Sequence, residues 1–276
     1  MTPEVHMTPF RLIQPGGDGI TAGINRESAR QSFLDYASCY DMDDPKIRLK
    51  VDHTLSVCDL CVRIADSLSL SADDTNLAWM MGLLHDIGRF EQVRQYHTFR
   101  DSESVNHAWF GADLLFQEGL IRDYLKEDSF DDLIEKAVRN HNAYRLPEGL
   151  SERERTFCQI LRDADKIDIL RVNRQTPMTQ IYNLPEDAFL YSEISDPVFK
   201  DMLHHRDVDR KNSRTGIDFL LGHIAFVFGL VYPVSFRIVK EQGYLDQMLS
   251  FESRNENTRM KMEIIRGEVL ACMRDA

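Results

Sequence analysis

The sequence lacks the features of a membrane protein and of a protein that binds nucleic acid. A membrane span needs about 20 consecutive apolar residues, and the most apolar segment, residues 219–234, is shorter and contains His223. We expect it to be a buried core helix. No block of Lys and Arg stands out, and the formal net charge is -12. Because binding to a phosphate backbone needs a basic face, we expect no nucleic-acid polymer and no membrane as partner.

The chain also lacks the cysteine pattern of a secreted protein. Its five cysteines are Cys39, Cys58, Cys61, Cys158 and Cys272. An odd number in a chain of this length argues against a disulfide framework. Cys58 and Cys61 form a C-x-x-C pair without a second pair, inside an amphipathic stretch, so we expect them to pack in the core. No basic segment followed by an apolar run opens the chain. These features predict a cytoplasmic protein.

Alternating strand patterns and internal repeats are absent, whereas apolar residues at helical spacing are common. The pattern predicts helices over about 44–65, 73–86, 104–117, 130–141 and 151–172. Gly88 and Gly119 are expected to end the second and third of these helices, and Ser151 with Glu154 to form a capping box. Residues 173–210 contain Pro177, Pro185 and Pro197 and are expected to be less regular, and helices resume near 213.

The predicted fold class is therefore all-α. Residues 1–26, rich in Gly, Pro and Thr, are expected to form an N-terminal arm or extension. Residues 27–276 are expected to form a single helical domain, in which the C-terminal helices pack onto the first five.

Histidine and aspartate recur at the ends of these helices or inside their apolar stretches, where a polar side chain is costly unless something compensates it. A capping role would explain the pair His85-Asp86 taken alone. The whole set, however, spreads over several core helices: His53, His85, Asp86, His107, His141 and Asp165. Imidazole and carboxylate together suit a borderline divalent metal. We therefore predict a two-metal site inside the bundle, with Asp86 as the bridging carboxylate.

The order of His53, His85-Asp86 and Asp165 resembles the four-residue signature of the HD-domain superfamily of metal-dependent phosphohydrolases. The local sequence agrees, because an apolar run precedes His85, Ile87-Gly88 follows Asp86, and Asp163-Ala164 precedes Asp165. The resemblance covers about residues 30–172. It implies an HD-domain-like helical bundle with additional C-terminal helices.

Two further histidines resemble the extra ligands of the two-metal branches of this superfamily, which include the HD-GYP cyclic-dinucleotide phosphodiesterases and the HD-type di-iron oxygenases. The resemblance implies one ion on His53, His85, Asp86 and Asp165, and a second on Asp86, His107 and His141. No Gly-Tyr-Pro motif stands at the equivalent place, and Asn142 follows His141. The chain therefore does not resemble a standard HD-GYP protein.

The resemblance implies a phosphatase or phosphodiesterase that hydrolyses a small anionic phosphate ester, a nucleotide or phosphomonoester, with a metal-bridged hydroxide. The ions would be Fe, Mn, Ni, Co or Zn, with Mg less favoured by so many imidazoles. Besides Asp86, the predicted catalytic residues are Arg89, one turn beyond it, and Lys166, beside Asp165; a surface ion pair is the alternative for both. Lys50 and Arg145 are weaker candidates.

Two other functions stay open at this point. The same ligands suit an HD-type di-iron oxygenase, and a signalling or binding module could keep its metals with little turnover. Asp168, almost one turn beyond Asp165, is expected to support a ligand. The remaining histidines are not assigned to the metal set, and His223 is predicted to be a satisfied core histidine.

Overall fold

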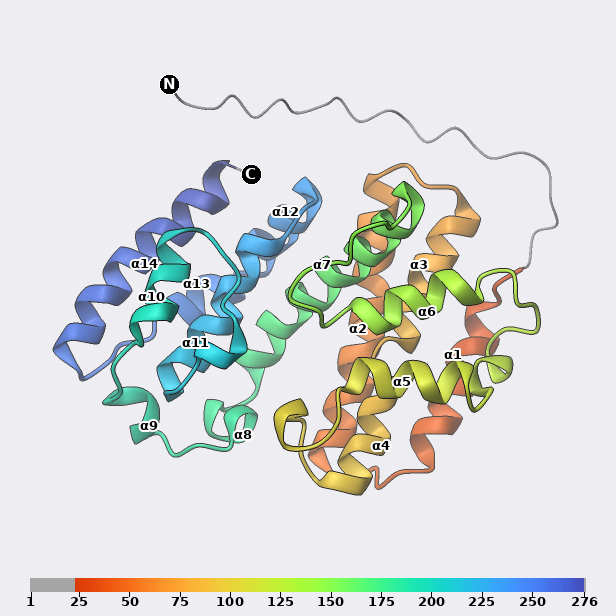
Figure 1. Cartoon of the computed structure of the whole chain (residues 1–276), viewed down its shortest axis with the longest axis horizontal. Coiled ribbons are helices and arrows are strands. Elements are labelled where there is room, and N and C mark those ends of the chain that lie inside the picture. The colour runs from red at the N-terminus through yellow and green to blue at the C-terminus, as the bar shows by residue number, and fades with distance from the viewer. Residues whose placement is uncertain (1–22, 276) are drawn as a thin grey trace.

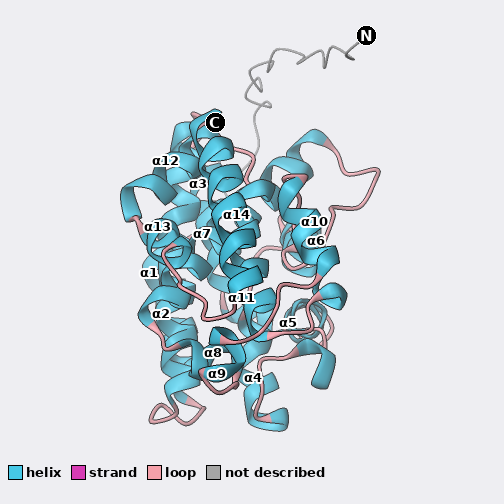
Figure 2. Ribbon diagram, turned by 90° about the vertical axis from the view of Figure 1, so that its left-hand side faces the viewer, coloured by secondary structure: helices cyan, strands magenta, loops and turns pink. Residues whose placement is uncertain are grey.

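The computed structural model describes residues 23–275, which consist of helices and connecting loops (Figure 1). Figure 2 shows no strand in this part of the chain, so the all-α prediction is confirmed. Most of the predicted N-terminal arm lies outside the described residues. Arg26, its last residue, already begins the first helix.

The N-terminal half contains the five helices that the apolar spacing predicts and two others, the first and the fourth, that it does not. They are α1 (Arg26–Ser38), α2 (Pro45–Ser67), α3 (Ala72–Leu84), α4 (Ile87–Tyr96), α5 (His107–Phe116), α6 (Asp131–Asn140) and α7 (Glu152–Gln175). Asp44 caps α2 by accepting a hydrogen bond from the amide of Lys46. The capping box of Ser151 and Glu154 is present at the start of α7. Local capping chemistry therefore fixes where both long helices begin.

The two glycines expected to end helices behave differently. Gly119 follows α5 with φ 82°, a left-handed conformation that suits glycine. Gly88, in contrast, lies in the first turn of α4, so that prediction was wrong. A Cβ on Gly88 would lie 2.6 Å from the backbone nitrogen of Gly111 and 2.6 Å from the carbonyl oxygen of His107. The glycine is there because α4 and α5 cross in close backbone contact.

The C-terminal half is more regular than predicted. Its helices are α8 (Met178–Tyr182), α9 (Asp187–Leu190), α10 (Asp196–Leu203), α11 (Gly216–Ile224), α12 (Pro233–Gln242), α13 (Tyr244–Leu249) and α14 (Glu256–Asp275). Pro177 precedes α8 directly, and Pro197 lies in the first turn of α10. The first turn of a helix tolerates proline because its amides have no intrahelical acceptor. These prolines therefore start helices in the segment that was expected to be irregular.

The segment 219–234 is buried or half-buried apart from Val231 and Pro233, but it is not one helix, so this prediction was wrong in part. After α11 the chain forms η4 (Ala225–Gly229), a 3-10 turn, and α12 begins only at Pro233. Proline cannot continue a helix in its interior, which explains the break before Pro233.

Helix α7 lies between the two halves of the molecule (Figure 1). It contacts α2, α3 and α6 of the N-terminal half and α11, α12 and α13 of the C-terminal half. Buried apolar side chains from both halves form one continuous core, which includes the free thiols of Cys58 and Cys61. None of the described helices combines the length and the apolar composition that crossing a bilayer requires.

Candidate metal centre

The structure brings all six predicted metal ligands together. His53 comes from α2, His85 and Asp86 connect α3 to α4, His107 opens α5, His141 follows α6, and Asp165 lies in α7. All except Asp165 are at most 4% exposed. The close crossing of α4 and α5 places His107 beside Asp86, and α7 packs against α2. Side chains from both ends of the N-terminal half therefore meet inside the bundle.

The two carboxylate oxygens of Asp86 face different pairs of histidines. Oδ2 lies 3.6 Å from Nε2 of His53 and 3.5 Å from Nε2 of His85. Oδ1 lies 3.4 Å from Nε2 of His107 and 3.7 Å from Nε2 of His141. Asp86 thus stands between two groups of metal-type donors, in the position of a bridging carboxylate.

Asp165 belongs to the first of these groups. Its Oδ1 lies 3.1 Å from Nε2 of His53 and 3.7 Å from Nε2 of His85. The second group consists of Asp86, His107 and His141, whose donor atoms all lie within 4.8 Å of one another. One group therefore offers four side chains and the other three, with Asp86 in both.

Backbone carbonyls hold two of the imidazoles in one tautomer. Nδ1 of His85 lies 2.7 Å from the carbonyl oxygen of Gly82, and Nδ1 of His141 lies 2.7 Å from that of Val138. A carbonyl oxygen can only accept, so each Nδ1 carries the hydrogen. The Nε2 atoms of both residues therefore turn a lone pair towards Asp86.

Carboxylates do the same for the other two imidazoles. Nδ1 of His53 lies 2.7 Å from Oδ2 of Asp168, and Nδ1 of His107 lies 2.7 Å from Oδ2 of Asp101. A hydrogen bond of this kind orients a metal-binding imidazole and makes it a stronger donor. The structure thus puts Asp168 where the sequence predicts a supporting residue. Asp101, in the loop before α5, was not predicted.

The six side chains fit a pair of divalent ions. Nε2 of His53 lies 3.3 Å from Nε2 of His85, and the same atoms of His107 and His141 are 3.0 Å apart. With hydrogen on Nδ1, each pair brings two lone pairs together, which is unfavourable unless a cation or a proton lies between them. Oδ1 of Asp86 is also buried without a hydrogen-bond partner. A metal ion in each group would satisfy these atoms.

The protonation states of His85, His107 and Asp86 are those of metal ligands. Burial lowers the pKa of His85 to about 4 and the pKa of His107 to about 3, so both imidazoles are neutral near neutral pH. Burial alone would raise the pKa of Asp86, but the positive charge of Lys50 holds it well below its usual range. Neutral imidazole nitrogens and an ionised carboxylate are the forms that bind divalent metals.

The HD domain family model matches residues 51–170 of the chain. These residues form an HD domain. For these residues, the match confirms the resemblance to the HD-domain superfamily that was drawn from the sequence. The HD domain contains all six residues of the cluster and runs from α2 into α7. No curated protein and no solved structure matches the chain.

The two cations predicted to be catalytic lie in different surroundings. Nε of Arg89 lies 3.5 Å from Oδ1 of Asp86, while its Nη1 donates to Asp101 and to the carbonyl oxygen of Phe99. Arg89 is therefore a buried support of the centre. Nζ of Lys166 lies 2.8 Å from Oδ2 of Asp207, and the ammonium group has no contact with the cluster among the described residues. The catalytic roles of Arg89 and Lys166 stay predictions.

Lys50 is the cation closest to the carboxylate that bridges the two groups. Its Nζ lies 2.6 Å from Oδ2 of Asp86, and its side chain is 14% exposed. The sequence contains a signal for this position, because Lys50 precedes His53 by three residues and so shares a face of α2 with it. The guanidinium of Arg145, the other weaker candidate, lies over the ring of Tyr144.

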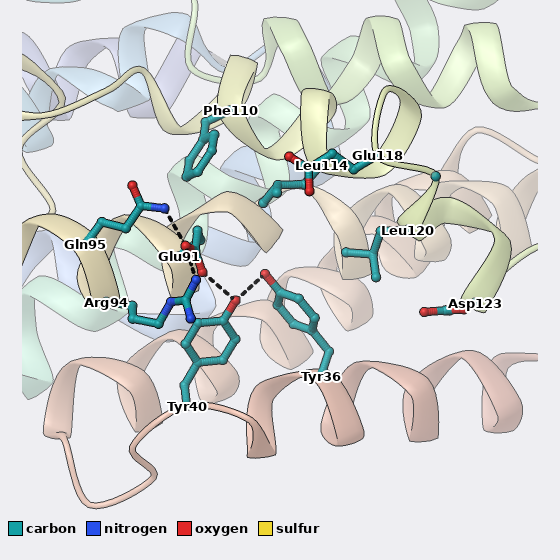
Figure 3. A pocket seen from close by; sticks show the side chains of 11 residues that line it. Tyr36, Tyr40, Glu91, Arg94, Gln95, Phe110, Leu114, Glu118, Leu120 and Asp123 are labelled. Atoms are coloured by element: carbon teal, nitrogen blue, oxygen red, sulfur yellow. Dashed lines mark hydrogen bonds and ion pairs between the residues drawn. The ribbon is translucent and has the colours of Figure 1, made fainter.

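A separate hollow of about 520 Å³ lies on another face of α4 (Figure 3). Its walls come from α1, α4, α5 and the segment after α5, and include Tyr36, Tyr40, Glu91 and Phe110. None of the six cluster residues lines it. The hydroxyl of Tyr36 donates to the carbonyl oxygen of Ile87, next to Asp86. One side chain that lines the hollow therefore contacts the backbone next to Asp86.

Proposed function

We propose that the protein is a metal-dependent phosphohydrolase that acts on a small phosphate ester and holds two transition-metal ions in its HD domain. The observation that carries this proposal is the position of Asp86, whose two oxygens face two separate pairs of histidines. The superfamily consists largely of hydrolases, which supports a hydrolytic reaction.

The ligands of the two ions follow from the two groups of donors. The first ion would be held by His53, His85, Asp86 and Asp165, and the second by Asp86, His107 and His141. Four imidazoles favour Fe, Mn, Co, Ni or Zn over Mg, which prefers oxygen ligands. Ions of this kind, when bound, acidify a water molecule and polarise a phosphoryl oxygen.

Other side chains of the HD domain prepare the site before any substrate arrives. Asp101 and Asp168 fix the rings of His107 and His53, and Arg89 joins Asp101 to the bridging carboxylate. The partly exposed ammonium of Lys50 provides positive charge at the edge of the centre. An anionic phosphate group would be attracted there, because charges in a site with little water interact strongly.

The test begins with the protein loaded separately with Mn(II), Zn(II) or Fe(II). Bound metal is measured by elemental analysis, and phosphate release from a panel of phosphomonoesters and dinucleotides is followed with each loaded form. We expect two ions per chain and phosphate release that Asp86→Asn reduces at least about a hundred-fold, since single catalytic groups contribute on this order. His107→Ala should bring the metal content towards one ion. His204→Ala is the matched control, because His204 is exposed and contacts only its own helix.

Each alternative function would give a different result. Oxygen uptake by the Fe(II) form without phosphate release would replace the hydrolase with a di-iron oxygenase. Two bound ions with neither activity would indicate a binding or signalling module. Absence of bound metal after loading would contradict the metal centre itself.

A further inference from the structure

His223 lies on α11, outside the HD domain, and one of its two ring nitrogens is satisfied. Its Nδ1 lies 2.9 Å from Oδ1 of Asn173 and 2.6 Å from the hydroxyl of Tyr182. The ring also packs on the ring of Tyr182 in a stacked arrangement, with centroids 5.4 Å apart. These contacts fix the orientation of the imidazole. For Nδ1, they agree with the prediction that His223 is a core histidine with its hydrogen bonds satisfied.

The partners of Nδ1 determine the tautomer. Nδ2 of Asn173 donates to the carbonyl oxygen of Ile169 at 2.8 Å, so the amide turns its oxygen towards His223. That oxygen can only accept, and it accepts from the Tyr182 hydroxyl at 2.6 Å as well. The hydrogen of the imidazole must therefore be on Nδ1. Burial lowers the pKa of His223 to about 3, so the ring is neutral and Nε2 has a free lone pair.

Nε2 of His223 is the nitrogen that the core does not satisfy. It has no hydrogen-bond partner among the described residues. It is also not one of the fully buried polar atoms without a partner, so it is accessible to solvent. The residue is only half-buried. An oriented acceptor thus reaches solvent from a ring that is otherwise packed and hydrogen-bonded.

The position of this acceptor is next to the metal centre. The carboxylate of Asp165 raises the pKa of His223 and the guanidinium of Arg210 lowers it, both less than burial does, so both charges lie nearby. The ring of Phe226 lies 5.3 Å from that of His223, and Nζ of Lys166 lies 5.5 Å from the centroid of the Phe226 ring. Asp165 and Ile169, one turn apart on α7, are both partly exposed. His223 therefore borders the side on which the first group of ligands reaches solvent.

Two hydrogen bonds hold the C-terminal half in place against the HD domain. Arg100, in the loop before α5, donates to the carbonyl oxygen of Tyr182, which is itself a partner of His223. The hydroxyl of Tyr144, after α6, donates to the carbonyl oxygen of Asp207 at 3.1 Å. Both bonds connect loops of the HD domain to the C-terminal half, which contains His223.

We infer that His223 determines substrate specificity: its Nε2 accepts a hydrogen bond from a hydroxyl on the alcohol part of a phosphate ester whose phosphate lies at the metal centre. The inferred substrate class is a phosphate ester of a hydroxylated alcohol, such as a polyol or sugar phosphate. An ammonium group is a poorer match, because Arg210 already supplies positive charge near His223. This inference rests on the proposed function and adds the recognition of the organic group to it.

The experiment compares ligands that differ by one hydroxyl. The ligands are alkyl phosphonates of two, three and four carbons and their ω-hydroxyl counterparts, which a phosphatase does not cleave. Zinc is chosen as the metal because it is redox-inert. Binding to the zinc-loaded full chain is therefore measured by calorimetry without turnover. We expect the hydroxylated member of at least one pair to bind about five-fold tighter, the worth of one neutral hydrogen bond. The preference should vanish in His223→Phe and persist in His204→Ala.

A second measurement on the unaltered protein does not depend on how the variants fold. Nitrogen NMR of the imidazoles reports which ring nitrogen of His223 carries the hydrogen, and the inference requires Nδ1. Hydrogen on Nε2, or equal binding within every pair of phosphonates, would overturn the inference and leave the proposed function standing. If neither the phosphonates nor inorganic phosphate bind the zinc-loaded protein, the proposed function fails and the role of His223 fails with it.

Discussion

Nζ of Lys50 lies 2.6 Å from Oδ2 of Asp86, the oxygen that also faces His53 and His85. An ammonium group and a metal ion would share this oxygen and repel each other, whereas an anionic substrate would be attracted to both. We therefore expect Lys50→Met to tighten binding of the first ion and to weaken binding of inorganic phosphate. Both changes should be on the order of ten-fold, because the ammonium is partly exposed and its field is screened.

Metal affinity is measured by competition with a chelator, and phosphate affinity by calorimetry on the loaded protein. Lys46→Met is the matched control, because Lys46 lies one turn earlier on α2 and donates to the carbonyl oxygen of His97. Equal metal affinity in Lys50→Met and in the unaltered protein would show that Lys50 does not act on the first ion.

The two supporting carboxylates should act on different ions. Asp168 holds His53, which belongs to the first group, and Asp101 holds His107, which belongs to the second. Loss of such a partner typically costs about 10–100-fold in metal affinity. We expect Asp168→Asn to weaken the first ion alone and Asp101→Asn the second alone, so each variant is the control of the other. Titration with Zn(II) resolves the two steps, and an equal effect of both variants on both steps would contradict this assignment.

The stability of the metal-free protein should depend on pH through Asp168. Burial raises the pKa of this carboxyl, but the hydrogen bond with His53 and the contact with Arg171 lower it to about 2. In the unfolded chain the pKa is about 3.9. The folded pKa is depressed, so the stabilisation is present above about pH 4 and is lost as the pH falls towards about 2, amounting to roughly 2 kcal/mol.

Urea unfolding of the metal-free protein at a series of acidic pH values measures this contribution. Asp168→Asn removes the titrating group, so its free energy of unfolding should fall less steeply over the same interval. Asp196→Asn changes an exposed carboxylate paired with Lys261 and serves as the control. Identical slopes in the two variants would exclude Asp168 as the source of the pH dependence.

The six cluster residues were predictable because each stands in or at the end of a helix whose apolar pattern is clear, at a position where an unpaired polar side chain would be costly. Asp101 was not, since it lies in a loop whose path does not follow from any periodicity. The surroundings of Lys166 were not predictable from its neighbour, because successive residues of a helix point about 100° apart. When Asp165 faces the histidines, Lys166 therefore points elsewhere, and it pairs with Asp207 from a distant loop.

The role of Gly88 was also not predictable from the sequence, in which it looks like a residue that ends a helix. The structure assigns it to the crossing of α4 and α5, where an added Cβ would meet the backbone of Gly111 and the carbonyl oxygen of His107. Backbone atoms cannot give way as the end of a flexible side chain can. We therefore expect Gly88→Ala to separate the two helices and to lower the free energy of unfolding by about 1–3 kcal/mol, the usual cost of overpacking.

Because His107 moves with α5, the same substitution should weaken the second ion more than the first. Gly222→Ala is the matched control, since Gly222 lies within α11 and an added Cβ there meets nothing within 4 Å. That change should stabilise the protein by up to about 1 kcal/mol through helix propensity alone. Thermal unfolding and zinc titration of both variants would decide the matter. Gly88→Ala with unchanged stability and two intact zinc sites would show that the crossing of α4 and α5 does not position the metal centre.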